Sequence, residues 1–220
     1  MPEPQSSTAP ALDPSRRKGE LTAERILDAA EALFAERGYA GTTLRDVATA
    51  VDLRIPSLYN HFHSKDALYA AVLERGIGPV LAILGDFGVE DAERRDPGTV
   101  IARVMALLQH HPNLPRLVLQ ETLAGGQRLT PMLREWIAPV FGRAGEMVVA
   151  SPSAGRWTPE QIPLLVLAMY HMVVGYFASA SLLADLDGID LLSPPIFAQQ
   201  TEVLREIVAS LFPAETPSKP

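Results

Sequence analysis

The sequence predicts an all-α protein, with an N-terminal three-helix domain that contains a helix-turn-helix and a larger helical domain after it. Three observations support this fold class. Apolar residues recur at three- and four-residue spacings along most of the 220 residues. Thr or Ser followed by Pro stands where helices would begin, as at Thr130-Pro131, Thr158-Pro159 and Ser193-Pro194. The alternating pattern that marks strands is nearly absent.

The composition excludes several other classes. The chain is 47% hydrophobic and 20% charged, which is an ordinary globular composition. It has no cysteine, so disulfide scaffolds, thiol nucleophiles and cysteine-ligated metal centres are excluded. The formal net charge of −7 gives the chain no overall attraction for polyphosphate. Any binding of nucleic acid must therefore come from a local arrangement of donors.

The N-terminal elements are predicted from their ends. Residues 1–19 contain a stretch rich in Pro, Ser and Ala and are expected to form a disordered tail. Thr22 is expected to cap the first helix, which should end before Gly38. Thr43 has Asp46 three residues later, a pattern that resembles a capping box. The first three helices are expected over residues 22–37, 44–51 and 55–61, with a tight turn between the last two.

The remaining elements are also expected to be helices. The fourth helix should begin at Lys65, and Gly76, Gly78 and Pro79 should end it or kink it. Later helices are expected over residues 99–110, 115–123, 131–149, 159–184 and 194–212, about nine in all. The predicted domains are a disordered tail (1–19), the helix-turn-helix domain (20–68), a second helical domain (69–213) and a flexible tail (214–220).

One segment has the length and composition of a membrane span. Residues 161–184 contain no charged side chain. Pro163, His171 and Gly175 dilute its hydrophobicity, and acidic residues flank it where Lys or Arg anchors would be expected. A helix that is apolar on nearly every side also suits a buried or subunit-interface helix. We expect no membrane partner, and a helical membrane-associated or interaction protein without DNA binding is the alternative interpretation.

The segment from Gly41 to Leu68 carries the main functional signal. Two short helices that meet at a tight turn form a helix-turn-helix, whose second helix can enter a major groove. Polar side chains around this frame suit contacts with phosphates and base edges. They are Thr42, Thr43, Arg45, Ser57, Tyr59, Asn60, His61 and Lys65. From spacing alone, an alternative stays open in which Leu58, Tyr59 and Phe62 form a core stripe and the other side chains are solvated.

A family resemblance favours DNA binding. Val47-Ala48 through Leu58-Tyr59-Asn60-His61-Phe62-His63-Ser64-Lys65-Asp66-Ala67-Leu68 closely resembles the signature of TetR-family transcriptional regulators. The resemblance covers about residues 21–73. It implies a homodimeric repressor that binds a palindromic, double-stranded DNA operator in the cytoplasm, at the nucleoid. By position it implies DNA contacts at Thr43, Arg45, Ile55, Pro56, Ser57, Tyr59, Asn60, His61 and Lys65.

The turn departs from the family pattern. The usual Gly-Val-Ser is replaced by Asp52-Leu53-Arg54. Asp52 can adopt the left-handed backbone conformation that Gly supplies, so the fold should survive. Arg54 replaces the Ser cap at the start of the second helix of the motif, where it could reach a phosphate or a guanine. Arg54 therefore joins the predicted DNA-binding residues, and the operator sequence does not follow from the family.

The resemblance assigns the later helices to dimerisation and to a small-molecule pocket. Apolar stripes on the helix over 159–184 and on the final helix are expected to form a four-helix interface with a second copy. The alternative is that both stripes pack within one monomer. Pocket candidates are Met105, Leu108, Leu119, Trp136, Val140, Phe141, Met169, Met172 and Tyr176. Methionines suit an adaptable pocket, so the expected effector is hydrophobic or aromatic.

An enzyme is the competing class, and the sequence lacks the motifs for it. There is no Glu-x-x-His, Gly-x-Ser-x-Gly, phosphate-binding Gly-x-x-x-x-Gly-Lys or dinucleotide fingerprint. We therefore expect no catalytic residues, no cofactor and no metal site.

Overall fold

The structure is a computed structural model that describes residues 14–86, 96–124, 131–151 and 153–213. These residues form ten α-helices and one 3-10 helix, with no strand among them, which confirms the all-α class. The elements are α1 (Pro14–Gly41), α2 (Leu44–Ala50), α3 (Ile55–Tyr59), α4 (Lys65–Gly85), α5 (Pro97–Gln109), α6 (Asn113–Ala124), α7 (Pro131–Ala150), η2 (Ala154–Arg156), α8 (Gln161–Ala178), α9 (Ala180–Asp187) and α10 (Pro194–Leu211).

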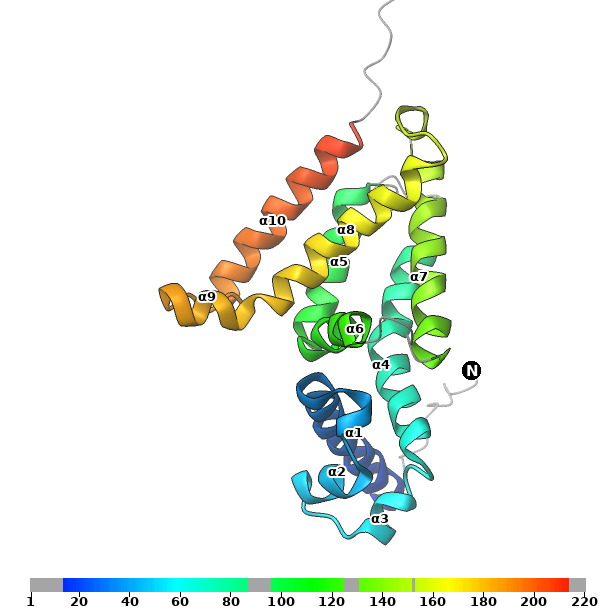
Figure 1. Ribbon diagram of the computed structural model, residues 1–220, viewed down its shortest axis with the longest axis vertical. Coiled ribbons are helices and arrows are strands. Elements are labelled where there is room, and N and C mark those ends of the chain that lie inside the picture. The colour runs from blue at the N-terminus through cyan, green and yellow to red at the C-terminus, as the bar shows by residue number, and fades with distance from the viewer. Residues whose placement is uncertain (1–13, 87–95, 125–130, 152, 214–220) are drawn as a thin grey trace, which may run out of the picture.

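The helices form two groups joined by α4. Figure 1 shows α1, α2 and α3 at one end of the elongated molecule, with α4 leading from them into the other helices. In the first group, α1 packs against α2 and α4, and α2 packs against α3. In the second, α4 packs against α5 and α7, α8 against α6 and α7, and α10 against α5. Helix α6 also packs against α1, so the two groups meet at two places.

The first helix begins earlier than the sequence predicts. It starts at Pro14, so residues 14–19 are helical, and the expected disordered tail is wrong for them; residues 1–13 lie outside the described residues. Thr22 is not a cap, because it lies inside the helix and its hydroxyl donates to the Lys18 carbonyl at 2.9 Å. Regular helix geometry ends where the sequence predicts, because Gly38 has φ 71° and ψ 171°. Only one further turn of α1 follows Gly38.

The helix-turn-helix group is held by a small core that its helices share. Its fully buried members come from all four helices, because the apolar spacing of each places one face inward. They include Ile26 and Phe34 of α1, Val47 and Ala48 of α2, Leu58 of α3, and Leu68, Tyr69 and Val72 of α4. Arg25 of α1 also donates a hydrogen bond, 3.1 Å long, to the carbonyl of Val51 at the end of α2.

The sequence predicts that Gly76, Gly78 and Pro79 end or kink the fourth helix; α4 does not end there but continues to Gly85. Pro79 removes one helical hydrogen bond, but packing on α1, α5 and α7 keeps the helix continuous. Gly76 has a packing role: a Cβ placed there would lie 2.4 Å from Cδ2 of Leu114 on α6. Its missing side chain therefore allows α4 and α6 to approach closely, and a flexible hinge at Gly76 and Gly78 has no support.

The two glycines are expected to respond differently to substitution. Gly76→Ala should lower the free energy of unfolding by about 1–3 kcal/mol, because Leu114 is buried and must shift. Gly78→Ala should change it by less than about 0.5 kcal/mol, because a Cβ there meets no atom within 4 Å outside its chain neighbours, and the helix preference of Ala is offset by Pro79, which disfavours helical geometry for a preceding residue with a Cβ. Urea unfolding of the two variants measures both changes. Equal shifts of the same sign would contradict the packing role of Gly76.

The long helix expected over 159–184 is two helices. Helix α8 ends at Ala178, Ser179 leaves helical geometry with ψ 0°, and α9 then runs in a different direction (Figure 1). Ten α-helices among the described residues therefore replace the expected nine. The predicted start at Thr158-Pro159 lies slightly early, since α8 begins at Gln161, whose side chain accepts from the Thr158 N–H at 3.0 Å.

Two of the described helices, α4 and α8, are long and apolar enough to cross a membrane by length and composition alone. Half of the apolar window of α4 is buried inside the structure, but only 39% of that of α8. The hydrophobicity of α4 is therefore largely explained by core packing, whereas α8 keeps apolar surface that no described part of the chain covers.

Candidate DNA-binding site and effector cavity

The helix-turn-helix forms as the sequence predicts. Helices α2 and α3 are joined by a turn in which Asp52 has φ 54°, the left-handed conformation expected of it in place of Gly. The Leu53 N–H donates to the Ala48 carbonyl at 2.8 Å and closes the turn. Helix α3 ends at Tyr59, two residues earlier than expected. Asn60 and His61 therefore follow the helix end rather than lie on the helix.

The two threonines before α2 have different roles. Thr43 is the N-cap and forms the predicted capping box: its hydroxyl oxygen accepts from the Asp46 N–H at 3.2 Å, and its own N–H donates to Asp46 Oδ2 at 2.8 Å. Its hydroxyl also donates to Oδ2 at 2.6 Å. The hydrogen bonds from Thr43 lower the pKa of Asp46. Thr42 is fully buried and hydrogen-bonds the carbonyls of Leu33 and Gly38 at 3.1 and 3.0 Å. The expected phosphate contact at Thr42 is therefore wrong.

The other candidate DNA-binding residues remain accessible around α3. The side chain of Tyr59 is 50% exposed, so it does not belong to a core stripe, whereas Leu58 is fully buried. The exposed candidates are Thr43, Arg45, Arg54, Pro56, Tyr59 and Asn60, and the half-buried ones are Ile55, Ser57, His61 and Lys65. All ten lie at the start of α2, in the turn, on or just after α3, or at the start of α4.

Tyr39 connects three helices beside this surface, although no sequence pattern singled it out. Its ring lies 4.2 Å from the Lys65 ammonium at the start of α4, and its hydroxyl donates to Asp66. Its N–H, just after the kink at Gly38, donates to Glu121 Oε1 of α6 at 2.8 Å. Burial and the hydrogen bond to Asp66 raise the pKa of Tyr39 to about 12, so the phenol stays protonated as a donor.

Arg75 of α4 makes a second connection between the groups. Its guanidinium lies 2.7 Å from carboxylates of both Glu31 and Asp28, and 3.2 Å from that of Glu24, all on α1. Glu31 is buried, and the Nδ1 of His111 lies 3.3 Å from it. The cluster places the Arg75 cation of the joining helix α4, and His111 of the second group, against the acidic face of α1.

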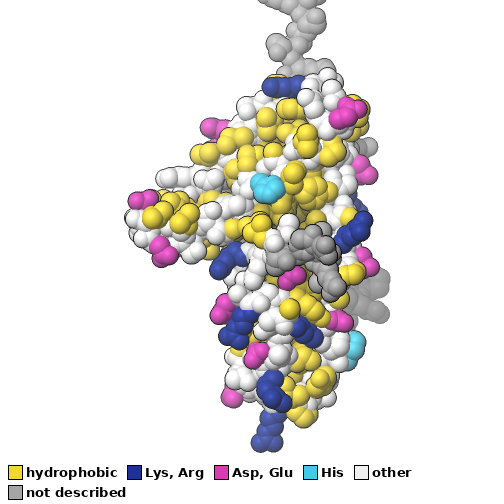
Figure 2. All heavy atoms as spheres, in the orientation of Figure 1, with side chains coloured by type: hydrophobic (Ala, Val, Ile, Leu, Met, Phe, Trp, Pro, Cys, Tyr) yellow, Lys and Arg dark blue, Asp and Glu magenta, His cyan; other side chains and the backbone are white. Residues whose placement is uncertain are grey.

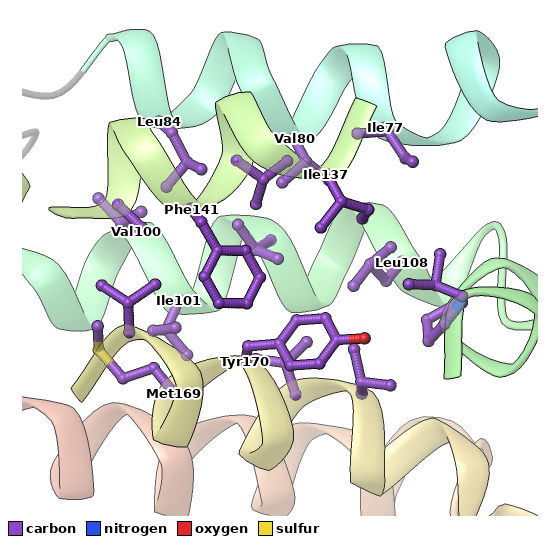
Figure 3. Close-up of a pocket in the computed structure, with 18 of the residues that line it drawn as sticks. Ile77, Val80, Leu84, Val100, Ile101, Leu108, Ile137, Phe141, Met169 and Tyr170 are labelled. Atoms are coloured by element: carbon purple, nitrogen blue, oxygen red, sulfur yellow. The ribbon is translucent and has the colours of Figure 1, made fainter. Parts of the chain in front are cut away.

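An apolar cavity of about 130 Å³ lies in the second group, between α4, α5, α6, α7 and α8 (Figure 3). Phe141 of α7 and Tyr170 of α8 project into it, with ring centroids 5.4 Å apart. Among the described residues that line it, Tyr170 is the one whose side chain carries an oxygen or nitrogen, and none is charged. Burial raises the pKa of Tyr170, which keeps its hydroxyl neutral.

The structure places four of the nine pocket candidates on the cavity wall: Leu108, Val140, Phe141 and Met169. The other five lie elsewhere: Met105 and Tyr176 are buried in the core, Trp136 and Met172 are half-buried against it, and Leu119 lines a separate surface groove beside α1. The Tyr176 hydroxyl donates to the Leu191 carbonyl and is thus already satisfied.

The wall formed by α4, and most of that formed by α5, was not predicted from the sequence. The missed residues of these two helices are Ile77, Val80, Leu84, Val100, Ile101 and Val104, and Tyr170 and the wall formed by α6 were missed as well. The available signal was the three- and four-residue spacing of Ile77, Val80 and Leu84, which continues across Pro79.

Helices α8 and α10 expose an apolar face. Figure 2 shows hydrophobic side chains gathered over the part of the molecule where these helices lie. Large exposed members are Leu164 and Leu167 of α8 and Val203 and Ile207 of α10, and α9 adds Leu182 and Leu186. The bulky stripe of α8 that contains Leu165, Met169 and Tyr176 is instead buried within the monomer. Among the described residues, no cluster of three or more His, Asp or Glu side chains could hold a metal ion.

Comparisons with known proteins agree with this architecture. The family described as bacterial regulatory proteins, tetR family, matches residues 26–72. The HTH-type transcriptional repressor KstR2 of Rhodococcus jostii is 45% identical over 64 residues, which cover 29% of this chain and 30% of that protein. The biofilm operon regulator IcaR of Staphylococcus aureus is 50% identical over 46 residues, covering 21% and 25%. The matches therefore span less than a third of these curated relatives.

Solved structures resemble the chain over most of its length. A putative fatty acid metabolism regulator of Clostridium perfringens has a TM-score of 0.64 at 20% identity, covering 88% of this chain and 100% of that one. The fatty acid degradation regulator FadR of Bacillus halodurans has a TM-score of 0.61 at 14% identity, covering 84% and 94%. At these identities the likeness shows a shared fold.

The fold and the geometry around α2 and α3 define a helix-turn-helix protein with a larger helical domain, an architecture that the solved structures share. Over residues 26–72, which form the helix-turn-helix domain, the chain matches the TetR family of bacterial transcriptional regulators.

Proposed function

We propose that this protein is a cytoplasmic, ligand-responsive repressor that binds a palindromic DNA operator as a homodimer and is released by a small hydrophobic or aromatic effector. One observation carries the proposal: an anionic chain presents a cluster of accessible donors around a short helix that fits a major groove. Arg45, Arg54 and Asn60 are exposed there and are assigned to base edges or adjacent phosphates. Lys65 is assigned to phosphate.

The exposed apolar face of α8 and α10 supports the homodimer. Several large hydrophobic side chains on it face solvent in the monomer, and such a patch usually marks an interface. A second copy packed on the same face would form a four-helix interface with closed two-fold symmetry. The two copies of α3 would then lie about 34 Å apart, one turn of duplex DNA, and would match a palindrome.

The cavity supports an uncharged apolar effector. A charged group in it would lose its hydration without gaining a partner, because no lining side chain is charged. An engineered cavity of about 150 Å³ with similar lining binds benzene, so a volume of about 130 Å³ suits a single aromatic ring or a short alkyl group. The effector would release DNA by binding better to a conformation in which the two copies of α3 no longer match the operator.

The direct test is a gel shift with the DNA that flanks the gene of this protein. Lys65→Ala is expected to weaken binding to every sequence and to lower the slope of log affinity against log salt by about one unit, because one phosphate contact is lost. The matched control is Arg134→Ala, which removes an exposed cation of α7 and should leave the slope unchanged. A change in sequence preference without a change in slope would contradict the phosphate role of Lys65.

A further inference from the structure

The cavity and the DNA-binding surface share one helix, α6. Leu114, Pro115 and Val118 of α6 form part of the cavity wall, and Glu121 follows Val118 by one helical turn. Because α6 also packs against α1, a side chain near the end of α6 can transmit a displacement of the cavity wall to the helix-turn-helix group. Glu121 is placed to do this, since its carboxylate accepts the N–H of Tyr39 on α1 at 2.8 Å.

The contact between Glu121 and Tyr39 depends on the kink at Gly38. The positive φ of Gly38 ends regular helix geometry, so the next N–H, that of Tyr39, is directed to α6. A Cβ at Gly38 would lie 3.5 Å from Glu121 Oε1, which shows how closely the two chain segments approach. A hydrogen bond from an N–H to a carboxylate is charge-assisted and therefore strong. Moving α6 must therefore either move Tyr39 or break this bond.

Tyr39 in turn fixes the side chain that is assigned to phosphate. Its ring packs against buried Phe34 and Tyr69, with centroids 6.1 and 4.9 Å away, so the ring cannot move independently of the domain core. The Lys65 ammonium lies 4.2 Å from the centroid of the same ring, while the Tyr39 hydroxyl holds the neighbouring Asp66. The position of Tyr39 therefore sets where the Lys65 ammonium lies.

We infer that Glu121 and Tyr39 are positioning residues that couple the cavity to DNA binding: occupation of the cavity displaces α6, and the Glu121–Tyr39 hydrogen bond transmits the displacement to Lys65. The inference rests on the proposed function, and it adds to that function a route that does not require a bend in α4. It requires two states of α6 that the effector and the operator favour differently.

The test fills the cavity by mutation and needs no identified effector. Ala144→Phe places a phenyl ring in the cavity from α7, where Ala144 is buried on the wall. It is combined with Glu121→Ala, and with Glu121→Gln, which keeps a carbonyl acceptor for the Tyr39 N–H. Each combination is titrated with the same operator duplex. If Ala144→Phe does not fold, Val104→Phe from α5 takes its place in the same cavity.

Filling the cavity is expected to weaken operator binding by at least about fivefold, a typical coupling between two sites. This result is expected both with Glu121 in place and in the Glu121→Gln variant. In the Glu121→Ala background, filling the cavity should weaken binding by less than about twofold, because the acceptor for the Tyr39 N–H is lost. Equal weakening in every background would overturn the inference, as would no weakening when Glu121 is unchanged.

A second measurement separates this inference from the proposed function. Hydrogen exchange of the Tyr39 amide is compared with the cavity empty and filled, in the absence of DNA. Filling is expected to change the exchange rate of that amide by at least about fivefold, because its acceptor is on α6. An unchanged rate would overturn the coupling role even in a protein that binds its operator. A protein that binds no duplex, but shows the change, would instead lose the proposed function and keep only the transmission from the cavity to Tyr39.

Discussion

Leu164→Asp combined with Val203→Asp is expected to leave the protein monomeric and to weaken binding to a two-half-site operator by about 100-fold or more. The two side chains are 65% and 48% exposed on the uncovered face of α8 and α10, so the substitutions should not disturb the monomer core. In a dimer they would bury carboxylates without partners. Loss of the dimer removes the avidity of two linked half-sites, which is worth about 10²–10⁴ in affinity.

The oligomeric state is measured by sedimentation velocity and the affinity by fluorescence anisotropy. Binding to a single half-site should be unchanged, since the substitutions lie far from α3 in the fold (Figure 1). The matched control is Val149→Asp, because Val149 is 60% exposed on α7, outside this face. If the double variant still sediments as a dimer, the interface does not lie on α8 and α10.

Arg75→Ala is expected to lower the free energy of unfolding by about 3 kcal/mol, because it leaves a buried carboxylate without its counter-charge. Most of this cost should come from Glu31, whose side chain is only 5% exposed and lies 2.7 Å from the guanidinium. Glu24 and Asp28 are mostly exposed, so their pairs with Arg75 should contribute little. For a chain of this length the melting temperature should fall by about 6–12 °C.

The role of Glu31 is tested by adding Glu31→Gln to Arg75→Ala. The neutral amide needs no counter-charge, so the double variant should regain much of the stability lost in the single one, as measured by calorimetry. Arg134→Ala, which removes an exposed cation on α7, serves as the control and should change stability by less than about 0.5 kcal/mol. Stability changes that simply add would show that Arg75 and Glu31 do not act as a pair.

The helix-turn-helix could be predicted well because its signals are local. Thr43 and Asp46 identify a helix start by their spacing alone, and the structure forms that capping box. Asp52 could replace Gly in the turn because a short polar side chain tolerates the left-handed region. Thr42 was misassigned because burial depends on the path of α1, which brings two carbonyls to its hydroxyl.

The cavity could be predicted only in part because five separate helices form it. Phe141 and Met169 lie on stripes that the sequence identifies as apolar, but a stripe does not tell a solid core from a cavity wall. Met105 and Tyr176 lie on similar stripes and are buried in the core. Which stripe borders empty space is decided by how the five helices pack around it.

The sequence by itself determined the all-α class, the helix-turn-helix and the set of donors around it, because apolar spacing, caps and turns act over a few neighbouring residues. Only the tertiary structure decided that α4 runs unbroken past Pro79, that α8 ends at Ala178, and that Tyr39 meets Lys65 and Glu121. These outcomes depend on packing between residues distant in the chain, whose energies exceed the local preferences of one glycine or proline.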